Sequence, residues 1–184
     1  KAFEKWRDNQ YQGIIALATG TGKTITALEA IIRFKKNNPH GFIFIVVPSQ
    51  PLAVQWRDDI HNLKKNLITI DGFDSKKNWF SKLSNLINQS KISKIDDAPI
   101  TIAVRKTFNT KEFQDQLKQL DGCIEKNNFI IVDECHNYNS PEQIKSLPKN
   151  INIRMGLSAT PYDQFEDEEE DRHLDQYFKK IVHT

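Results

Sequence analysis

The chain of 184 residues is long enough for one globular domain with a substantial core, since 38% of its residues are hydrophobic and 27% are charged. No stretch approaches the roughly 18 to 20 consecutive apolar residues of a membrane span, and no charged and then apolar leader opens the sequence. We therefore expect a cytoplasmic protein without a membrane partner. The two cysteines, Cys123 and Cys135, are too few and too far apart for a disulfide framework or a zinc knuckle.

The net charge of +2 conceals an uneven distribution. Residues 1–120 carry 19 Lys and Arg against 11 Asp and Glu, whereas residues 121–184 carry 7 against 13. The basic part suits a polyanionic partner, although a solvated lysine-rich surface explains it equally well. Much of the acidity lies in the run Glu166–Asp171, whose self-repulsion predicts an exposed loop without chemistry.

Short apolar runs alternate with longer segments of helical periodicity along the chain. The run Phe42–Val47 is apolar throughout, which indicates a strand that is buried on both faces. The pattern predicts an α/β fold in which a parallel sheet lies between two layers of helices. Strands are predicted at 13–18, 42–47, 67–70, 100–104, 129–132 and 153–157, and helices at 24–36, 52–63, 79–87 and 111–125.

Local signals place several boundaries of these elements. The segment Asn37–Gly41 ends the first predicted helix, and the segment Ser140–Glu142 is typical of a helix cap and first turn. Residues 75–99 show only weak periodicity, and we expect an irregular excursion there. The first predicted helix would direct four apolar residues toward the sheet: Ile25, Leu28, Ile31 and Ile32.

A glycine-rich segment, Ala18–Thr24, connects the first predicted strand to the first predicted helix. Such a turn binds phosphate, because its backbone N–H groups and the positive end of the helix dipole point at the anion. Gly20 and Gly22 permit the positive φ angles of the turn, and with Thr19 and Thr21 they would direct consecutive N–H groups into one concavity. Lys23 would then bridge the outer phosphates of a nucleoside triphosphate, and the hydroxyl of Thr24 would bind Mg²⁺.

The turn departs from the strict G-x-x-x-x-G-K-[ST] pattern, because Leu17 stands in place of the first glycine. A bare Gly-Lys-Thr also occurs in surface turns that carry an ordinary lysine. The buried strand before the turn and the amphipathic helix after it favour the phosphate site.

Two adjacent carboxylates, Asp133 and Glu134, follow the fifth apolar run. The carboxyl ends of parallel strands form one edge, where such sheets bind ligands, and the phosphate turn lies at the same edge. We expect Asp133 to hold Mg²⁺ through water and Glu134 to accept a proton from the water that attacks the γ-phosphate. The alternative is a strand-end pair that merely contacts solvent. Cys135 is expected to be a small buried residue, because no local base or cation lowers its pKa.

Two hydroxyl residues, Ser158 and Thr160, flank Ala159 at the end of the last predicted strand. They could hydrogen-bond the turn that carries His136 and so link two strands mechanically. The alternative is a hydroxyl-rich strand exit that Pro161 ends.

Together these motifs resemble the first motor domain of a superfamily 2 helicase or translocase. Residues 18–24 resemble motif I, residues 133–136 resemble a variant of the DEAD/DEAH motif II, and residues 158–160 resemble motif III. The wording of Gln55-Trp56 and of residues 157–162 is most similar to the branch with restriction-enzyme translocating subunits and excision-repair helicases. The resemblance implies a RecA-like P-loop domain that hydrolyses ATP with Mg²⁺ and acts on nucleic acid, with DNA favoured over RNA but not decided by the sequence.

The resemblance also implies roles for further residues. His136, Ser158 and Thr160 would couple the nucleotide state to movement. Pro48, Ser49 and Gln50 resemble the segment that touches the nucleic-acid backbone. Arg105 and Lys106 could bind phosphate nonspecifically at a position where the family offers a threonine and this chain has Val104.

A second RecA-like domain supplies arginines to the phosphoryl group in the family, and the residues after Thr160 are too few to encode one. We therefore expect residues 1–184 to be a single N-terminal RecA-like domain, a fragment of a longer chain. The adenine-reading glutamine would lie upstream, since Gln10 and Gln12 are too close to the first strand. Two other functions stay open, a non-catalytic nucleic-acid-binding module and a P-loop small-molecule kinase.

Overall fold

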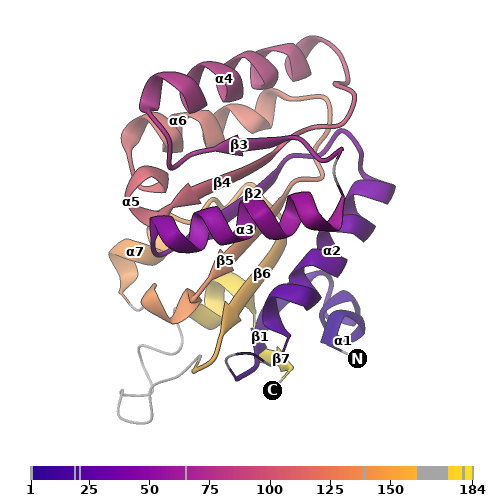
Figure 1. Ribbon diagram of the computed structural model, residues 1–184, viewed down its shortest axis with the longest axis vertical. Coiled ribbons are helices and arrows are strands. Elements are labelled where there is room, and N and C mark those ends of the chain that lie inside the picture. The colour runs from indigo at the N-terminus through magenta and orange to yellow at the C-terminus, as the bar shows by residue number, and fades with distance from the viewer. Residues whose placement is uncertain are drawn as a thin grey trace.

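The computed structural model describes residues 2–18, 20, 22–64, 66–138, 140–160, 174–179 and 181–183. Seven strands form a parallel sheet in the order β3-β4-β2-β5-β6-β1-β7, with helices on both faces (Figure 1). The predicted α/β fold with a parallel sheet is thereby confirmed. The strands are β1 Gln12–Ala16, β2 Ile43–Val47, β3 Thr69–Asp71, β4 Ile100–Val104, β5 Phe129–Asp133, β6 Ile153–Ser158 and β7 Ile181–His183. The helices are α1 Ala2–Asp8, α2 Lys23–Asn37, α3 Gln50–Leu63, α4 Lys76–Ile92, α5 Arg105–Phe108, α6 Lys111–Gln119 and α7 Pro141–Lys145, with 3-10 turns η1 Leu120–Gly122 and η2 Cys135–Asn137.

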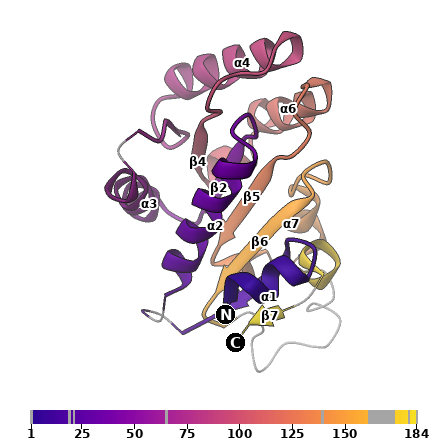
Figure 2. The same cartoon turned by 90° about the vertical axis from the view of Figure 1, so that its right-hand side faces the viewer.

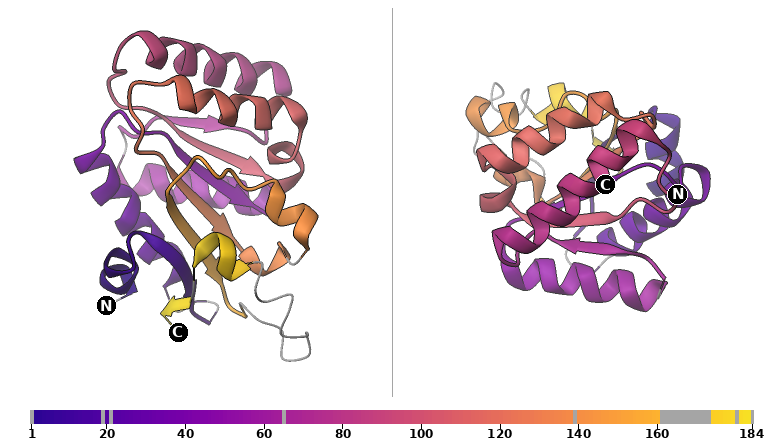
Figure 3. Two further views of the ribbon diagram at one scale, coloured as in Figure 1. Left: turned by 180° about the vertical axis from the view of Figure 1, so that it is seen from behind. Right: turned by 90° about the horizontal axis from the view of Figure 1, so that it is seen from above.

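The helices form two layers, with α1, α2 and α3 on one face of the sheet and α4, α5, α6 and α7 on the other (Figures 2 and 3). Side chains of β5 alternate between the two layers: Phe129 and Ile131 face α2 and α3, whereas Ile130 and Val132 face the opposite side. Every residue of β2 is buried, as a strand covered on both faces requires.

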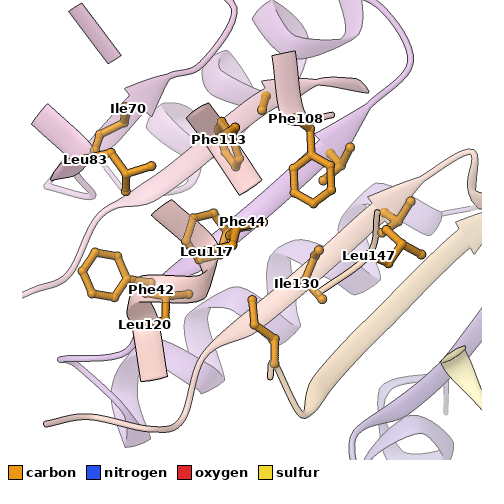
Figure 4. Packing of buried hydrophobic residues seen from close by; sticks show 14 of the residues in the cluster. Phe42, Phe44, Ile70, Leu83, Phe108, Phe113, Leu117, Leu120, Ile130 and Leu147 are labelled. Atoms are coloured by element: carbon orange, nitrogen blue, oxygen red, sulfur yellow. The ribbon is translucent and has the colours of Figure 1, made fainter. Parts of the chain in front are cut away.

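Aromatic and aliphatic side chains fill the layer under α4 and α6 (Figure 4). Phe44 on β2 meets Phe113 on α6 with ring centroids 6.3 Å apart, and Phe108 on α5 lies 5.3 Å from Phe113. This packing holds the sheet rigid on the face that α4 and α6 cover, so that the loops at its carboxyl edge start from rigid strands.

The helix predicted at 79–87 is confirmed and extends over Lys76–Ile92 as α4, so the irregular excursion expected at 75–99 is wrong. Its buried residues Trp79, Leu83 and Ile87 recur every four positions, so the helix needs only a narrow apolar stripe among polar residues. Two short elements, α5 and β7, were also not predicted.

The predicted burial of the first helix is partly wrong. Ile25 is 72% exposed and Ile32 is 39% exposed. The face of α2 that packs on the sheet is turned relative to the prediction, and it consists of Ala27, Ala30, Ile31 and Phe34.

Other local predictions are confirmed. α2 ends at Asn37, and the side chain of Ser140 caps α7 by accepting a hydrogen bond from the backbone N–H of Gln143. No helix among the described residues is long and apolar enough to cross a membrane. The acidic run Glu166–Asp171 lies outside the described residues.

Candidate active site

The predicted site residues follow the carboxyl ends of parallel strands and therefore gather at one edge of the sheet (Figure 1). The phosphate turn follows β1, the acidic pair ends β5, and Ser158 ends β6. β6 lies between β1 and β5, so α2 must bring its first residues across β6 to reach the acidic pair.

The phosphate turn has the backbone that its glycines predict. Gly20 has a φ of 80° and Gly22 a φ of 107°, and a Cβ atom on either would meet nothing within 4 Å. The left-handed conformation, and not crowding, therefore demands glycine here. Gly22 precedes α2 and gives its first turn no side-chain cap, so backbone N–H groups of that turn are open to an anion. Thr19 and Thr21 lie outside the described residues.

Lys23 and Glu134 form an ion pair, with Nζ 3.3 Å from Oε1. The side chains are 10% and 29% exposed, so the pair lies in a partly buried recess. Glu134 has φ 47° and ψ 52°, a left-handed conformation that non-glycine residues rarely adopt. Residues in such conformations cluster at functional sites. This left-handed residue breaks the alternation of β5 where the carboxylate meets Lys23.

Asp133 is the last residue of β5, and the alternation of that strand places it on the side of α2 and α3. Its Oδ2 accepts a hydrogen bond from Nε1 of Trp56 at 2.8 Å, and its Oδ1 accepts one from the backbone N–H of Glu134 at 3.0 Å. Burial raises the pKa of this carboxyl, while the two hydrogen bonds and the nearby Lys23 oppose the rise.

The oxygen donors at this edge fit Mg²⁺, which prefers hard oxygen ligands from one or two protein groups together with phosphate and water. Asp133 is a half-buried carboxylate that forms no ion pair with a basic group among the described residues. Thr24 lies half-buried in the first turn of α2, on the phosphate side. These two residues would hold the ion.

His136 lies between the acidic pair and β6. Its Nδ1 is 2.8 Å from Oγ of Ser158 and 3.4 Å from Oε2 of Glu134. The same Oγ accepts a hydrogen bond from the backbone N–H of Thr160 at 3.1 Å. The contact expected between the turn of His136 and the end of the last strand is therefore present.

Cys135 is fully buried, as expected, and burial raises the pKa of its thiol far above its usual range. Its Sγ would lie 3.0 Å from a Cβ atom at position 156, so Gly156 on β6 leaves the space that this thiol fills. The residue packs the turn against the sheet.

The predicted nucleic-acid contacts also lie at the carboxyl edge. Pro48 and Ser49 are half-buried after β2, and Gln50 is exposed at the start of α3. Lys106 is exposed on α5. Arg105 has an internal role that the sequence did not indicate, because it donates a hydrogen bond to the carbonyl of Asn137 at 2.8 Å.

A cavity of about 780 Å³ lies at the opposite edge of the sheet. Trp6, Tyr11, Arg33 and Asn127 are among its lining residues, and they surround the starts of β1, β5 and β6. The cavity is therefore separate from the candidate active site.

A family model described as type III restriction enzyme, res subunit, matches residues 1–163. The chain belongs to this family. It is 29% identical over 161 residues to the putative DNA 3'-5' helicase Rad25 of Haloarcula marismortui, an alignment that covers 88% of this chain and 22% of that protein. The chain thus spans about a fifth of the length of this curated relative.

Solved structures share the fold. The UvsW helicase of bacteriophage T4 superimposes with a TM-score of 0.63 at 22% identity, over 94% of this chain and 54% of that chain. The ATP-dependent Type ISP restriction-modification enzyme LlaBIII bound to DNA gives a TM-score of 0.67 at 17% identity, over 99% of this chain and 14% of that chain. The predicted resemblance to the first RecA-like domain of superfamily 2 proteins is confirmed.

Proposed function

We propose that the chain is the ATP-binding and ATP-hydrolysing motor domain of a DNA-dependent helicase or translocase. The single observation that carries this proposal is the contact of 3.3 Å between Nζ of Lys23 and Oε1 of Glu134. It joins the phosphate turn after β1 to the acidic pair after β5, which is the arrangement that phosphoryl transfer to water requires. The family and the helicase named among the relatives support the same conclusion.

The phosphate turn and the start of α2 would bind the triphosphate. Backbone N–H groups of Gly20, Gly22 and the first turn of α2 would contact the phosphate oxygens, with Thr19 and Thr21 completing the loop. Lys23 would neutralise the outer phosphates as a point charge. Mg²⁺ bound by Thr24 and Asp133 would neutralise charge on the phosphoryl oxygens.

Glu134 would act as the general base. Its carboxylate lies between Lys23 and His136, at 3.3 Å and 3.4 Å. A bound triphosphate offers Lys23 a second anionic partner, which leaves the carboxylate available to orient a water and take its proton. His136 also contacts Ser158, which accepts a hydrogen bond from the N–H of Thr160. A shift of the carboxylate would therefore alter these contacts at the end of β6.

Pro48, Ser49, Gln50 and Lys106 would contact the nucleic-acid backbone at the same edge. DNA is favoured over RNA because the matched relative is named a DNA helicase and a matched structure holds DNA. A second RecA-like domain would supply arginine to the phosphoryl group, a contribution worth about 10³ to 10⁵ in rate in related systems. The 184 residues alone would therefore hydrolyse ATP slowly. A cytoplasmic location stays a prediction.

The proposal is tested by ATP hydrolysis of the full-length protein with single-stranded DNA, duplex DNA or RNA added in turn. We expect DNA to stimulate the rate. Stimulation by a metabolite would favour the small-molecule kinase, and salt-dependent DNA binding without any nucleotide effect would favour the non-catalytic module.

The phosphate-binding role is tested with Lys23→Ala, which should abolish binding of Mg²⁺-ATP. Lys36→Ala is the matched control, because Lys36 is an exposed lysine on the same helix. Equal ATP affinity of the wild type and Lys23→Ala would contradict the assignment of Lys23 to phosphate binding.

A further inference from the structure

Trp56 reaches the acidic pair from a different layer of the fold. It lies on the sheet-facing side of α3 with Ala53 and Ile60, and it is 2% exposed. Its indole N–H donates to Oδ2 of Asp133 at 2.8 Å across 77 positions of sequence. An indole nitrogen can only donate, so the direction of this hydrogen bond is unambiguous.

This hydrogen bond completes the fixation of the Asp133 carboxylate. Oδ1 is held by the backbone N–H of Glu134 and Oδ2 by Trp56, so the plane of the carboxylate is set at both oxygens. Each oxygen keeps a second lone pair for a water or a cation. Among the described residues, Trp56 is the one side chain that donates to Asp133.

The helix that carries Trp56 begins at the predicted nucleic-acid contact. α3 starts at Gln50, directly after Pro48 and Ser49, and Ser49 makes no side-chain capping bond to the helix. Trp56 follows Gln50 by six residues, or about 9 Å along the axis at 1.5 Å per residue. A displacement of the start of α3 therefore moves the indole relative to Asp133.

We propose that Trp56 is a positioning residue, which orients the Asp133 carboxylate toward Mg²⁺ and through which α3 transmits contact at residues 48–50 to the magnesium site. This inference rests on the proposed function. It adds a residue of α3 to a site that otherwise consists of the phosphate turn and the acidic pair.

The test compares Trp56→Phe with Trp6→Phe in the full-length protein. Trp6 is also 2% exposed, and its indole N–H also donates at 2.8 Å, but to the carbonyl of Arg154 near the opposite edge of the sheet. Both variants lose one indole N–H and the same volume. A general loss of packing therefore affects both, whereas only Trp56 touches Asp133.

The first measurement is binding of a non-hydrolysable ATP analogue at increasing Mg²⁺ concentration, with Mn²⁺ binding followed by electron paramagnetic resonance. We expect Trp56→Phe to raise the half-saturating metal concentration about 10- to 100-fold, as loss of a partner that orients a metal ligand does elsewhere. Trp6→Phe should leave it unchanged. The second measurement is stimulation of ATP hydrolysis by DNA at saturating Mg²⁺, which Trp56→Phe should reduce and Trp6→Phe should preserve.

Equal metal requirements in the two variants would overturn the inference, while metal-dependent nucleotide binding by the wild type would keep the proposed function. Wild-type protein without such binding would overturn both. If Trp56→Phe does not fold, 3-benzothienylalanine at position 56 keeps the ring volume and removes only the N–H donor. The same shift in metal requirement is then expected, and its absence would contradict the role of the hydrogen bond.

Discussion

Nζ of Lys23 lies 3.3 Å from Oε1 of Glu134, although 111 positions separate the two residues. Glu134→Gln keeps the shape of the side chain but removes its ability to accept a proton. We expect ATP hydrolysis to fall by about 10² to 10⁴-fold, the usual contribution of a general base. Nucleotide affinity should be retained, because the phosphate turn and Lys23 are untouched. Single-turnover hydrolysis and equilibrium binding check both parts, and a rate within a few-fold of the wild type would exclude Glu134 as the base.

Ser158→Ala should separate hydrolysis from movement. The substitution removes the oxygen that contacts His136 and that accepts the hydrogen bond from the N–H of Thr160, at a cost of about 0.5 to 1.5 kcal/mol of stability because Thr160 is exposed to water. ATP binding should persist, whereas DNA translocation per ATP should fall. Ser90→Ala is the control, because this buried serine bonds the carbonyl of Ile87 far from the site. Undiminished translocation in Ser158→Ala would contradict a coupling role.

Gly156→Ala should destabilise the fold by about 1 to 3 kcal/mol through overpacking. The added Cβ would lie 3.0 Å from both Sγ of Cys135 and Cγ1 of Ile14, which are buried. Adding Cys135→Ala should recover part of the loss, because it removes one of the two obstructing atoms. Urea unfolding of the wild type, the two single variants and the double variant measures the coupling energy between positions 156 and 135. Strictly additive effects would show that Gly156 and Cys135 do not compete for the same space.

The stability of the fold should depend on pH through Lys35. Burial lowers the pKa of this lysine to about 8, although Asp97 lies 3.7 Å away and opposes the shift. Between pH 8 and the ordinary pKa of 10.5 the unfolded chain binds the extra proton, so the free energy of unfolding contributed by Lys35 rises with pH. The full rise is on the order of 3 kcal/mol.

The measurement is urea unfolding at several values between pH 7 and pH 9.5 for the wild type and Lys35→Met. The thiol of Cys135, whose pKa burial raises, acts in the opposite direction in part of this range, so the two pH profiles are compared rather than read singly. We expect the free energy of unfolding of Lys35→Met to lack the rise with pH that Lys35 contributes in the wild type. Parallel profiles would show that Lys35 is charged in the folded protein throughout this range.

The sheet is largely predictable from sequence because strands covered on both faces are nearly continuous apolar runs, as β2 and β5 are. β7 is different, because its three residues are too few to show a strand pattern in the sequence. They form a strand only by pairing with β1. The four residues of α5 are too few to show periodicity. The rotation of α2 escaped prediction because Ile25 and Ala27 both fit a helix, and only the packing decides which is buried.

The approach of Lys23 to Glu134 is predictable because a phosphate turn and a strand-end acidic pair must share the carboxyl edge of a parallel sheet. The hydrogen bond from Trp56 to Asp133 is not predictable, because it depends on how α3 packs on β2, β3 and β4. The sequence shows only that Trp56 lies on the apolar face of a helix that follows the predicted nucleic-acid contact at residues 48–50. The hydrogen bond from Arg105 to the carbonyl of Asn137 could not be predicted for the same reason, since that carbonyl lies in the turn after β5.

The position of β6 between β1 and β5 has a consequence for synthesis on the ribosome. β1 is made first, but its neighbours in the sheet are β6 and β7, which are made last. Ile14 and Ile15 therefore emerge from the exit tunnel with no strand to join until residues 153–158 have followed. β1 must therefore wait until β6 has been synthesised, and its apolar side chains need shielding from other chains during that time.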